Sequence, residues 1–491
     1  MTTQLIPKRT KIVATIGPAS DSLEVLEQLA RAGVNVFRLN FSHSTHEYHK
    51  QTLDRIREVE KKVGFKIGVL QDICGPKIRV GKLENPFELH SGDKIIVRRD
   101  EIVGKKIEDH VYELSINHPQ ICDLIKVDEY IYLIDGAIRA KVTSVCKDHI
   151  ETVIENDGIL YSNKGVNFPN TKLNIDVITP KDKLDIEWGA KNDVDFVAIS
   201  FVQHKQDVLN AKSLIKQYGG HGKVYSKIEK FDAIENIDEI IEASDGIMVA
   251  RGDLGIEIPF YQVPACQKKI IHKANELCKP VITATQMMLS MVKNDMATRA
   301  EISDVANAVL DGTDAVMLSE ETAVGDHPAA VVKAMAETIH EIEKIYPYGK
   351  YDEFKFADET EMVSSSTARL ATRIGVKAII SLTASGQSAV KIARNRPECD
   401  ILAVTHTDQI ARVLTMVWGV TPVLLIKADR LNLMLASTIK GLLQNKSIAD
   451  NHTYIMTAGY PTGFVGSLNY VRILRKEQIE YYSNVQNKDL K

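Results

Sequence analysis

Lys223–Glu257 reads KVYSKIEKFDAIENIDEIIEASDGIMVARGDLGIE, and its hydrophobic pattern changes twice along its length. Lys223–Ile228 alternates as a strand does, and Gly246–Ala250 is a short apolar run after the turn pair Asp245–Gly246. The segment between these strands carries isoleucine at helical spacing, at Ile234, Ile237, Ile240 and Ile241. The stretch therefore predicts a β-α-β unit, the connection that joins parallel strands.

The polar residues of this unit gather where its strands end. Lys227 and Glu229 close the first strand, and Arg251, Gly252 and Asp253 follow the second as a predicted turn, whose backbone N–H groups suit a carboxylate or phosphate. In parallel α/β folds the active site lies at the carboxyl ends of the strands, so Glu229 and Asp253 should share one space. Two carboxylates in one site repel unless a cation neutralises them, and oxygen ligands favour Mg²⁺ or Mn²⁺. This placement argues against the alternative of two surface carboxylates and a solvated lysine.

Composition sets limits on the class of protein. A chain of 491 residues has room for about three domains. The net charge is −4 with 26% charged residues, so nothing suggests a nucleic-acid-binding or membrane-seeking surface. The six cysteines are scattered without a CxxC pair, which is typical of reduced thiols. Without a long apolar segment, the sequence predicts a soluble, cytoplasmic protein.

Strand and helix patterns alternate through most of the first 346 residues, which favours an α/β (β/α)₈ TIM barrel over an open sheet. The predicted barrel domain comprises residues 1–75 and 173–346. Polar residues follow many of its strands. The eight strands are expected at Lys11–Ile16, Val34–Leu39, Ile67–Gln71, Asp195–Ser200, Lys223–Ile228, Gly246–Ala250, Pro280–Thr285 and Asp314–Ser319.

Two further regions interrupt or follow this alternation. Residues 76–172 contain short strand-like pieces and turns without a long helical pattern, which predicts an inserted β-barrel domain that acts as a lid. Residues 347–491 begin with a linker and then return to alternation, which predicts a C-terminal α/β domain. Its strands are expected at Ala378–Leu382, Ile401–Val404, Pro422–Ile426, Tyr454–Thr457 and Tyr470–Leu474.

The motifs SKIE (residues 226–229) and MVARGDLGIEIP (residues 248–259) resemble the signatures of the pyruvate kinase family. The resemblance spans nearly the whole chain, strongly in the barrel and weakly elsewhere. It implies a glycolytic enzyme that transfers the phosphoryl group of phosphoenolpyruvate to ADP, giving ATP and pyruvate. Glu229 and Asp253 would hold Mg²⁺ or Mn²⁺, while Lys227, Arg38 and Arg79 would neutralise the transferring group. A phosphoryl group needs such positioning and charge stabilisation more than a nucleophile.

The resemblance assigns further residues. The segment RLNFSH (residues 38–43) places Arg38, Asn40 and His43 at the nucleotide, together with Arg79 and with Lys181 of the TPKD segment. The segment ITATQMM (residues 282–288) places Thr285 near the methylene carbon of the substrate, where a relayed water is a better proton donor than the hydroxyl itself. With Arg38 and Lys227, the substrate site would include Gly252, Asp253 and Thr285.

One motif departs from the family pattern. In QDICGPKIR (residues 71–79), many relatives have Thr-Lys after the aspartate and Glu after the proline, where this chain has Ile73-Cys74 and Lys77. The family's monovalent-cation site would consist of Asn40, Ser42, Asp72 and Ile73, with the ammonium of Lys77 taking over the work of K⁺. This hypothesis predicts that the enzyme is active without K⁺. If Lys77 instead points into solvent, the enzyme would still require K⁺ for activity.

The C-terminal region offers a candidate effector site. Thr383–Ser388 is a glycine- and hydroxyl-rich turn that suits a phosphate, and in regulated relatives the equivalent turn binds a sugar phosphate. Thr383, Ser385 and Ser388 would then bind a sugar-phosphate or AMP effector; an ordinary Ser-capped helix is the alternative. A homotetramer is the family expectation.

Two other functions remain open from sequence alone. A different Mg²⁺-dependent barrel enzyme acting on phosphoenolpyruvate or an enolate would use the carboxylate pair without needing the arginines. A non-catalytic, effector-binding relative should have lost a ligand or the lysine, and Lys227, Glu229 and Asp253 are all present.

Overall fold

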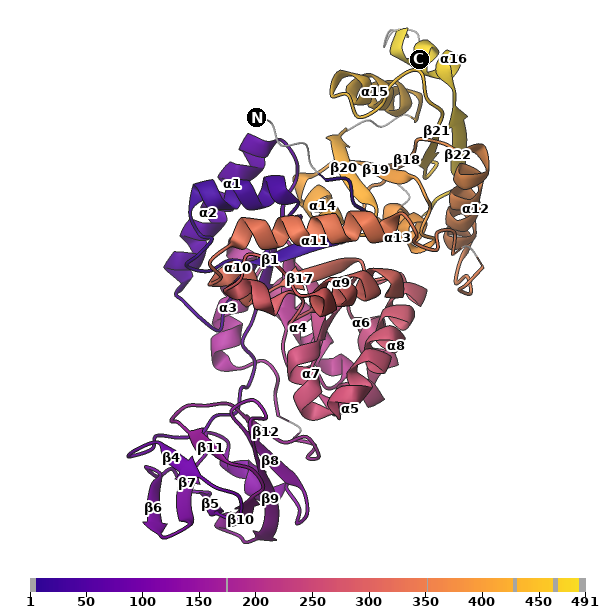
Figure 1. The fold of residues 1–491 in the computed structure, drawn as a ribbon. Helices are drawn as coiled ribbons and strands as arrows, with labels where there is room; N and C mark the ends of the chain where they lie inside the picture. Colours follow the sequence, from indigo (N-terminus) through magenta and orange to yellow (C-terminus); the bar gives the residue numbers. More distant parts are fainter. Residues whose placement is uncertain (1–5, 174, 351, 427–430, 462–466, 485–491) are drawn as a thin grey trace.

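Eight parallel strands close into a barrel in the computed structural model, which describes residues 6–173, 175–350, 352–426, 431–461 and 467–484. Around the barrel the order is β1-β17-β16-β15-β14-β13-β3-β2, and nearly all strand positions are buried, as in parallel sheets covered on both faces. The predicted α/β barrel is confirmed (Figure 1). The strands are β1 (Lys11–Thr15), β2 (Val36–Asn40), β3 (Gly68–Asp72), β13 (Phe196–Ile199), β14 (Lys223–Ile228), β15 (Gly246–Ala250), β16 (Val281–Ala284) and β17 (Ala315–Leu318).

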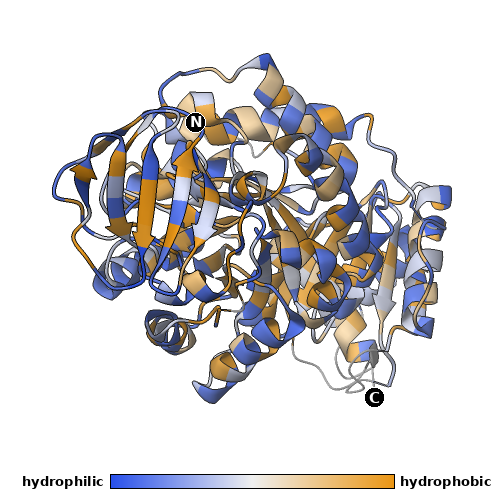
Figure 2. Ribbon diagram, turned by 90° about the horizontal axis from the view of Figure 1, so that it is seen from below, coloured by the Kyte–Doolittle hydropathy of each residue, from blue (hydrophilic) through white to orange (hydrophobic). Residues whose placement is uncertain are grey.

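Helices surround the barrel and bury one apolar face each against it (Figure 2). Some of them begin with a side-chain cap, as where the Ser22 hydroxyl accepts from the amide of Val25 at the start of α1. The single helix predicted between β14 and β15 is two short ones that meet at Asn236, whose side chain donates to the carbonyl of Gln203. The helices are α1 (Leu23–Ala32), α2 (His46–Val63), α3 (Pro180–Lys191), α4 (Lys205–Gln217), α5 (Phe231–Glu235), α6 (Ile237–Ala243), α7 (Arg251–Glu257), α8 (Val263–Glu276), α9 (Arg299–Asp311), α10 (Glu320–Ala323) and α11 (Pro328–Glu343), with the 3₁₀ turns η2 (Phe260–Gln262) and η3 (Leu289–Val292).

The insert leaves the carboxyl end of β3 and returns at α3, so it lies beyond that end of the barrel (Figure 1). Its seven-stranded sheet curls into a half-barrel in the order β12-β8-β9-β10-β5-β7-β6, and β11 pairs separately with β4. This confirms the predicted inserted β domain. Its elements are β4 (Phe87–Leu89), β5 (Lys94–Arg98), β6 (Lys105–Glu108), β7 (Val111–Ser115), η1 (Pro119–Asp123), β8 (Tyr130–Leu133), β9 (Ile138–Val145), β10 (His149–Ile154), β11 (Gly158–Leu160) and β12 (Val166–Asn167).

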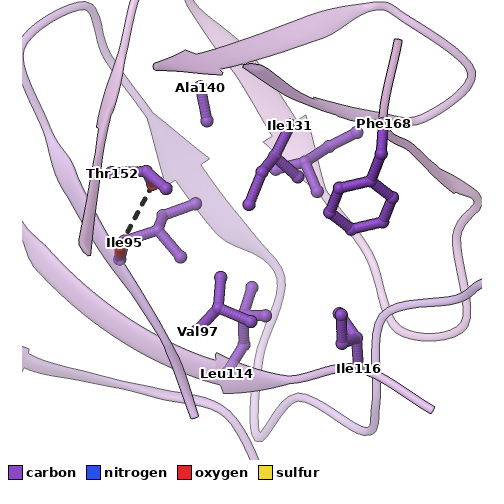
Figure 3. Close-up of a pocket in the computed structure, with 9 residues that line it drawn as sticks. Ile95, Val97, Leu114, Ile116, Ile131, Ala140, Thr152 and Phe168 are labelled. Atoms are coloured by element: carbon purple, nitrogen blue, oxygen red, sulfur yellow. Dashed lines mark hydrogen bonds between the residues drawn. The ribbon is translucent and has the colours of Figure 1, made fainter. Parts of the chain in front are cut away.

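The curled sheet of the insert encloses its own apolar core. Side chains from both sides of the curl, including Ile95, Ile131 and Phe168, converge on a small apolar cavity (Figure 3). Thr152 is the polar exception, and its hydroxyl donates to the carbonyl of Ile95 at 3.1 Å. The insert therefore has the separate hydrophobic core that an independent domain needs.

The C-terminal domain is a five-stranded sheet in the order β20-β19-β18-β21-β22, parallel except for the antiparallel edge strand β22. The predicted C-terminal α/β domain is confirmed. The residue-level boundaries of all three domains stay a prediction. The elements are α12 (Glu359–Ile374), β18 (Ala378–Leu382), α13 (Gln387–Arg394), β19 (Asp400–Thr405), α14 (Asp408–Val413), η4 (Leu414–Met416), β20 (Val420–Leu425), α15 (Leu431–Gln444), β21 (Tyr454–Ala458), β22 (Tyr470–Leu474) and α16 (Lys476–Asn484).

This domain closes the amino-terminal end of the barrel, opposite the insert. Met416 of η4 joins the apolar cluster inside the barrel, where it packs with residues such as Val13 and Val36. The open end of the barrel is therefore the carboxyl end, which faces the insert (Figure 1). None of the helices within the described ranges is long and apolar enough to span a membrane.

Arg396 anchors the C-terminal domain to the barrel. It is 1% exposed, donates to Asp314 at 3.2 Å, to Asn275 at 3.0 Å and to the carbonyl of Gly312 at 2.7 Å, and lies 4.8 Å over the ring of Trp418. Arg396→Met leaves these acceptors buried without their cation, so we expect a loss of about 3–5 kcal/mol of stability. Unfolding in denaturant, followed by tryptophan fluorescence, measures the loss in the free energy of unfolding.

A matched surface variant controls for this substitution. Lys344 forms an exposed ion pair with Glu341, so Lys344→Met should change stability by less than about 0.5 kcal/mol. A loss at Arg396→Met as small as that of the control would contradict the anchoring role.

Candidate active site

The carboxyl ends of the barrel strands bring polar side chains into one cluster. Arg38 lies in β2, Asp72 ends β3 and Lys227 lies in β14. Gly252 and Asp253 follow β15, and Thr285 follows β16. The predicted strand ends therefore do meet at one end of the barrel, the end that faces the insert (Figure 1).

Lys227 lies at the centre of this cluster. Its Nζ is 2.8 Å from Glu229 Oε1, 3.3 Å from Asp72 Oδ1, and donates to the hydroxyl of Ser200 at 2.8 Å. Burial disfavours the charged ammonium, but the carboxylates of Asp72, Glu229 and Asp253 outweigh it and raise the pKa of Lys227. The lysine is therefore a fixed positive charge.

Asp72 orients the two cations of the site. One carboxylate oxygen accepts from Arg38 Nε at 2.7 Å, and the other faces Lys227. Although burial alone raises the pKa of Asp72, Lys227 and Arg38 outweigh that effect and lower it. Arg38 also donates to the hydroxyl of Thr15 at 2.9 Å, so its guanidinium is held from two sides. Asp72, predicted at the monovalent-cation site, is here the partner of both basic groups.

Glu229 and Asp253 form the predicted carboxylate pair. Glu229 is 1% exposed, and its Oε2 accepts from the amide of Phe201 at 2.9 Å. Burial and then the negative charge of Asp253 raise the pKa of Glu229 against the opposing effect of Lys227. The carboxylate of Asp253 has no hydrogen-bond partner in the described part of the chain. The ammonium of Lys227 faces Glu229, whereas Asp253 has no ion pair within the described ranges.

The donor set of this pair fits a magnesium ion. No group of three or more His, Cys, Asp or Glu side chains arranged for a metal occurs among the described residues, so a zinc-type cage is not present there. Mg²⁺ instead binds through one or two carboxylates and completes its shell with water and substrate oxygens. The half-buried Asp253 carboxylate, which accepts no hydrogen bond from any residue that the structure describes, and the raised pKa of Glu229 suit a divalent cation.

The predicted turn after β15 is wrong, because helix α7 begins directly at Arg251. The amide of Gly252 is not free, as it donates to the hydroxyl of Thr285 at 2.7 Å. Thr285 has a φ of 68°, a strained conformation for a β-branched residue, and its carbonyl accepts from Arg251 Nη2 at 2.7 Å. Arg251 in turn pairs with Asp304, so the end of β16 is held tightly against α7.

Residues assigned to the nucleotide lie along the loop after β2. Asn40 Oδ1 accepts from the amide of Ser42 at 3.1 Å, and Ser42 and His43 are exposed. Lys181 donates to the carbonyl of Phe41 at 2.8 Å and to Asp185 Oδ2 at 2.6 Å. These contacts bring Lys181 from α3 beside the β2 loop.

Sequence reasoning missed Asp185, which is buried and holds both Lys181 and His46, the latter at 2.7 Å. Its position four residues after Lys181 in a predicted helix was the available signal. Ser200 and Thr15 were missed as well, because a hydroxyl beside a strand is usually structural.

Two predicted residues belong to the insert side of the site. Arg79 donates to the carbonyl of Asn163 at 3.0 Å, and Lys77 pairs with Asp135 at 3.3 Å. Neither contacts Arg38 or Lys227 through a hydrogen bond or ion pair in the described ranges. Gly75, just before them, has a φ of 69°, and a side chain there would meet the ring of Phe201 at 2.8 Å. The glycine therefore permits the tight exit of the chain into the insert.

The predicted effector turn lies after β18, far from the barrel cluster. The hydroxyl of Thr383 accepts from the amide of Gly386 at 3.0 Å, and the hydroxyls of Ser381 and Ser388 are 3.3 Å apart. Gly386, with a φ of 87°, caps α13 without a side-chain bond, so the alternative of a Ser-capped helix is wrong. Ser385 is half-buried in the same turn.

Comparison with protein-family models matches both large parts of the chain. Residues 7–332 match the model for the pyruvate kinase barrel domain, and residues 361–474 match the model for the pyruvate kinase alpha/beta domain. The chain belongs to the pyruvate kinase family.

Known pyruvate kinases align with almost the entire chain. The enzyme of Staphylococcus epidermidis (strain ATCC 35984) is 43% identical over 474 residues, covering 95% of this chain and 80% of that protein. The enzyme of Staphylococcus aureus (strain MRSA252) is 42% identical with the same coverage. The crystal structure of a pyruvate kinase from Cryptosporidium parvum has a TM-score of 0.90 at 34% identity, covering 95% of this chain and 96% of that one.

As a pyruvate kinase by family, the chain is a phosphotransferase. Membership in this family sets aside the alternative of a different barrel enzyme, and the full-length similarity to curated pyruvate kinases argues against a non-catalytic relative.

Proposed function

We propose that the chain transfers the phosphoryl group of phosphoenolpyruvate to ADP, giving ATP and pyruvate, with Mg²⁺ or Mn²⁺ held by Glu229 and Asp253. The observation that carries this proposal is the Lys227 ammonium, fixed between Asp72, Glu229 and Ser200 beside Asp253. A bound divalent ion would neutralise substrate oxygens and orient them. A site rich in fixed cations and poor in nucleophiles suits phosphoryl transfer.

Cationic side chains take the charge of the transferring group. The bond from phosphorus to the enol oxygen breaks as a bond to a β-phosphate oxygen of ADP forms. Arg38 and Lys227 approach the group from the barrel, already oriented by Asp72. Arg79 belongs to the insert side, so its contribution requires the insert to act as a lid that also excludes water. Arg38, Asn40, His43, Arg79 and Lys181 would contact the nucleotide.

The remaining step places a proton on the methylene carbon of enolpyruvate. Gly252, Asp253 and Thr285 would line the pyruvate end of the site. The hydroxyl of Thr285 accepts a hydrogen bond from the amide of Gly252 and donates one to the carbonyl of Ala284 at 2.7 Å, so its orientation is fixed. A hydroxyl is a weak acid, and a water relayed beside Thr285 is the better proton donor.

We also propose that K⁺ is not required. Asn40, Ser42, Asp72 and Ile73 correspond to the family's monovalent-cation ligands, and Lys77 stands where K⁺-dependent relatives carry a glutamate. Lys77 lines the same cavity as Asp253, which supports a charge-balancing role, although its ion pair is with Asp135. A sugar phosphate or AMP at Thr383, Ser385 and Ser388 is the proposed effector interaction.

A homotetramer is the proposed assembly. Phe260 and Tyr261 are 79% and 70% exposed beside α7 and α8, the kind of apolar surface that another copy would cover. Light scattering on the purified chain measures the mass; a monomer at micromolar concentration would contradict the proposal.

The direct test of the activity is pyruvate formation from phosphoenolpyruvate, ADP and Mg²⁺. The expected result is equal formation of pyruvate and ATP, lost when ADP or the divalent ion is omitted. Absence of pyruvate, with and without K⁺, sugar phosphates and AMP, would overturn the proposal.

A further inference from the structure

A second ion pair lies behind the proposed metal ligands and has no part in the chemistry described above. Lys230 Nζ donates to Glu257 Oε2 at 2.9 Å, and the two residues are 4% and 5% exposed. Sequence reasoning gave neither residue a role. Charged residues are almost never this buried unless they are paired, so the position of each depends on the other.

The pair joins the two segments that carry the metal carboxylates. Lys230 follows Glu229 directly in the chain, at the end of β14. Glu257 lies one helical turn after Asp253 in α7, and Asp253, Glu257 and Lys230 line one small cavity of about 30 Å³ between barrel and insert. The ion pair therefore spans from the Glu229 segment to the Asp253 helix.

Helix α7 needs such an external contact to hold its position. It has seven residues, and Ala250 at its N-cap makes no side-chain capping bond. A helix this short is marginal without tertiary contacts. Arg251 holds its first turn through Asp304, and Glu257 holds its last turn through Lys230. Asp253 lies between these two fixed points.

The insert contacts the same carboxylate. Asn167 of β12 lies with its Nδ2 3.4 Å from Glu257 Oε1, on the side away from Lys230. This contact is long and involves a neutral donor, so it is weaker than the ion pair.

We propose that Lys230 and Glu257 are positioning residues that set the separation of Glu229 and Asp253 and thereby the affinity of the divalent-metal site. The inference rests on the proposed metal ligands. A buried ion pair often adds little to the stability of the fold, because apolar residues of similar volume can replace it without loss. The presence of charged residues at these two positions therefore favours a role in geometry. Partners behind metal ligands typically contribute 10–100-fold to metal affinity.

The test measures Mn²⁺ binding without substrates, from the electron paramagnetic resonance signal of free Mn²⁺. Lys230→Met and Glu257→Gln are expected to weaken Mn²⁺ binding by about 10–100-fold relative to the wild-type chain. The double variant Lys230→Met/Glu257→Leu removes the unpaired buried charge and should restore thermal stability, yet leave Mn²⁺ binding weak. A purely structural pair would instead recover both properties together.

Two controls separate this effect from general destabilisation. Arg394 and Glu361 form a buried ion pair in the C-terminal domain at 2.7 Å, so Arg394→Met should lower thermal stability while Mn²⁺ binding stays within about twofold. Asn167→Ala removes only the insert contact and should also stay within about twofold.

The outcomes distinguish the inference from the proposed function. Wild-type chain that fails to bind Mn²⁺ would overturn the metal site and, with it, the inference. If both single variants bound Mn²⁺ as tightly as the wild-type chain, the positioning role alone would be overturned. The same conclusion would follow if Asn167→Ala weakened Mn²⁺ binding as much as Lys230→Met. Weak binding confined to the Lys230 and Glu257 variants would support it.

Discussion

Lys227→Met is expected to slow pyruvate formation by about 10³–10⁵-fold, the range that an arginine finger contributes in other phosphoryl-transfer enzymes. Lys227 is the group in contact with Asp72, Glu229 and Ser200 at once, and its charge is fixed by the carboxylates around it. Methionine keeps most of the side-chain volume and removes the charge. Steady-state kinetics at saturating phosphoenolpyruvate and ADP measure the loss in kcat.

Metal binding separates this loss from damage to the site. Without Lys227, Glu229 Oε1 loses its competing ammonium, so Mn²⁺ should bind the variant at least as tightly as the wild-type chain. The positioning variants at Lys230 should show the opposite pattern, with weak Mn²⁺ binding that high metal concentrations overcome. A Lys227→Met enzyme with turnover within about tenfold of wild type would remove Lys227 from the mechanism.

Local patterning was sufficient for the strands that carry the site. Lys223–Ile228 and Gly246–Ala250 form β14 and β15 with the predicted bounds, because short, largely apolar stretches that end at polar or turn residues are typical of strands buried in a parallel barrel. The positions of Lys227, Glu229 and Asp253 could be predicted from the strand ends, because all eight strands of the barrel are parallel and their carboxyl ends lie at one end of it.

Tertiary contacts decided what the sequence left hidden. Residues 251–253 were predicted as a turn, but they form the first part of α7; Gly252 disfavours a helix, and contacts such as Arg251–Asp304 override that preference. The partners Asp185 and Glu257 are ordinary acidic residues in sequence. Only the packing of α3 beside the β2 loop, and of α7 beside β14, makes them partners of Lys181 and Lys230.

Lys77→Glu is expected to make the enzyme depend on K⁺. In wild-type chain, activity in K⁺-free buffer should lie within about twofold of activity with K⁺. The variant should lose at least about 100-fold without K⁺ and recover when K⁺ is added. The substitution changes the local charge by two units in a cavity that Asp135 and Asp253 also line. Two unit charges roughly 8 Å apart interact by about 2 kcal/mol at an effective dielectric constant of about 20, so a change of two units is large enough to account for this loss of activity.

Asp135 decides between two reasons for such a result. Lys77 either supplies positive charge to the site or orders the start of the insert through its ion pair with Asp135 at 3.3 Å. Asp135→Asn removes the ion pair and keeps the ammonium, so it should remain active without K⁺ if charge is the reason. Lys77→Met removes both, and should lose less activity than Lys77→Glu because it adds no negative charge. If Asp135→Asn required K⁺ as Lys77→Glu does, the order of the insert would be the cause, and a wild-type chain inactive without K⁺ would end the role of Lys77 as a cation substitute.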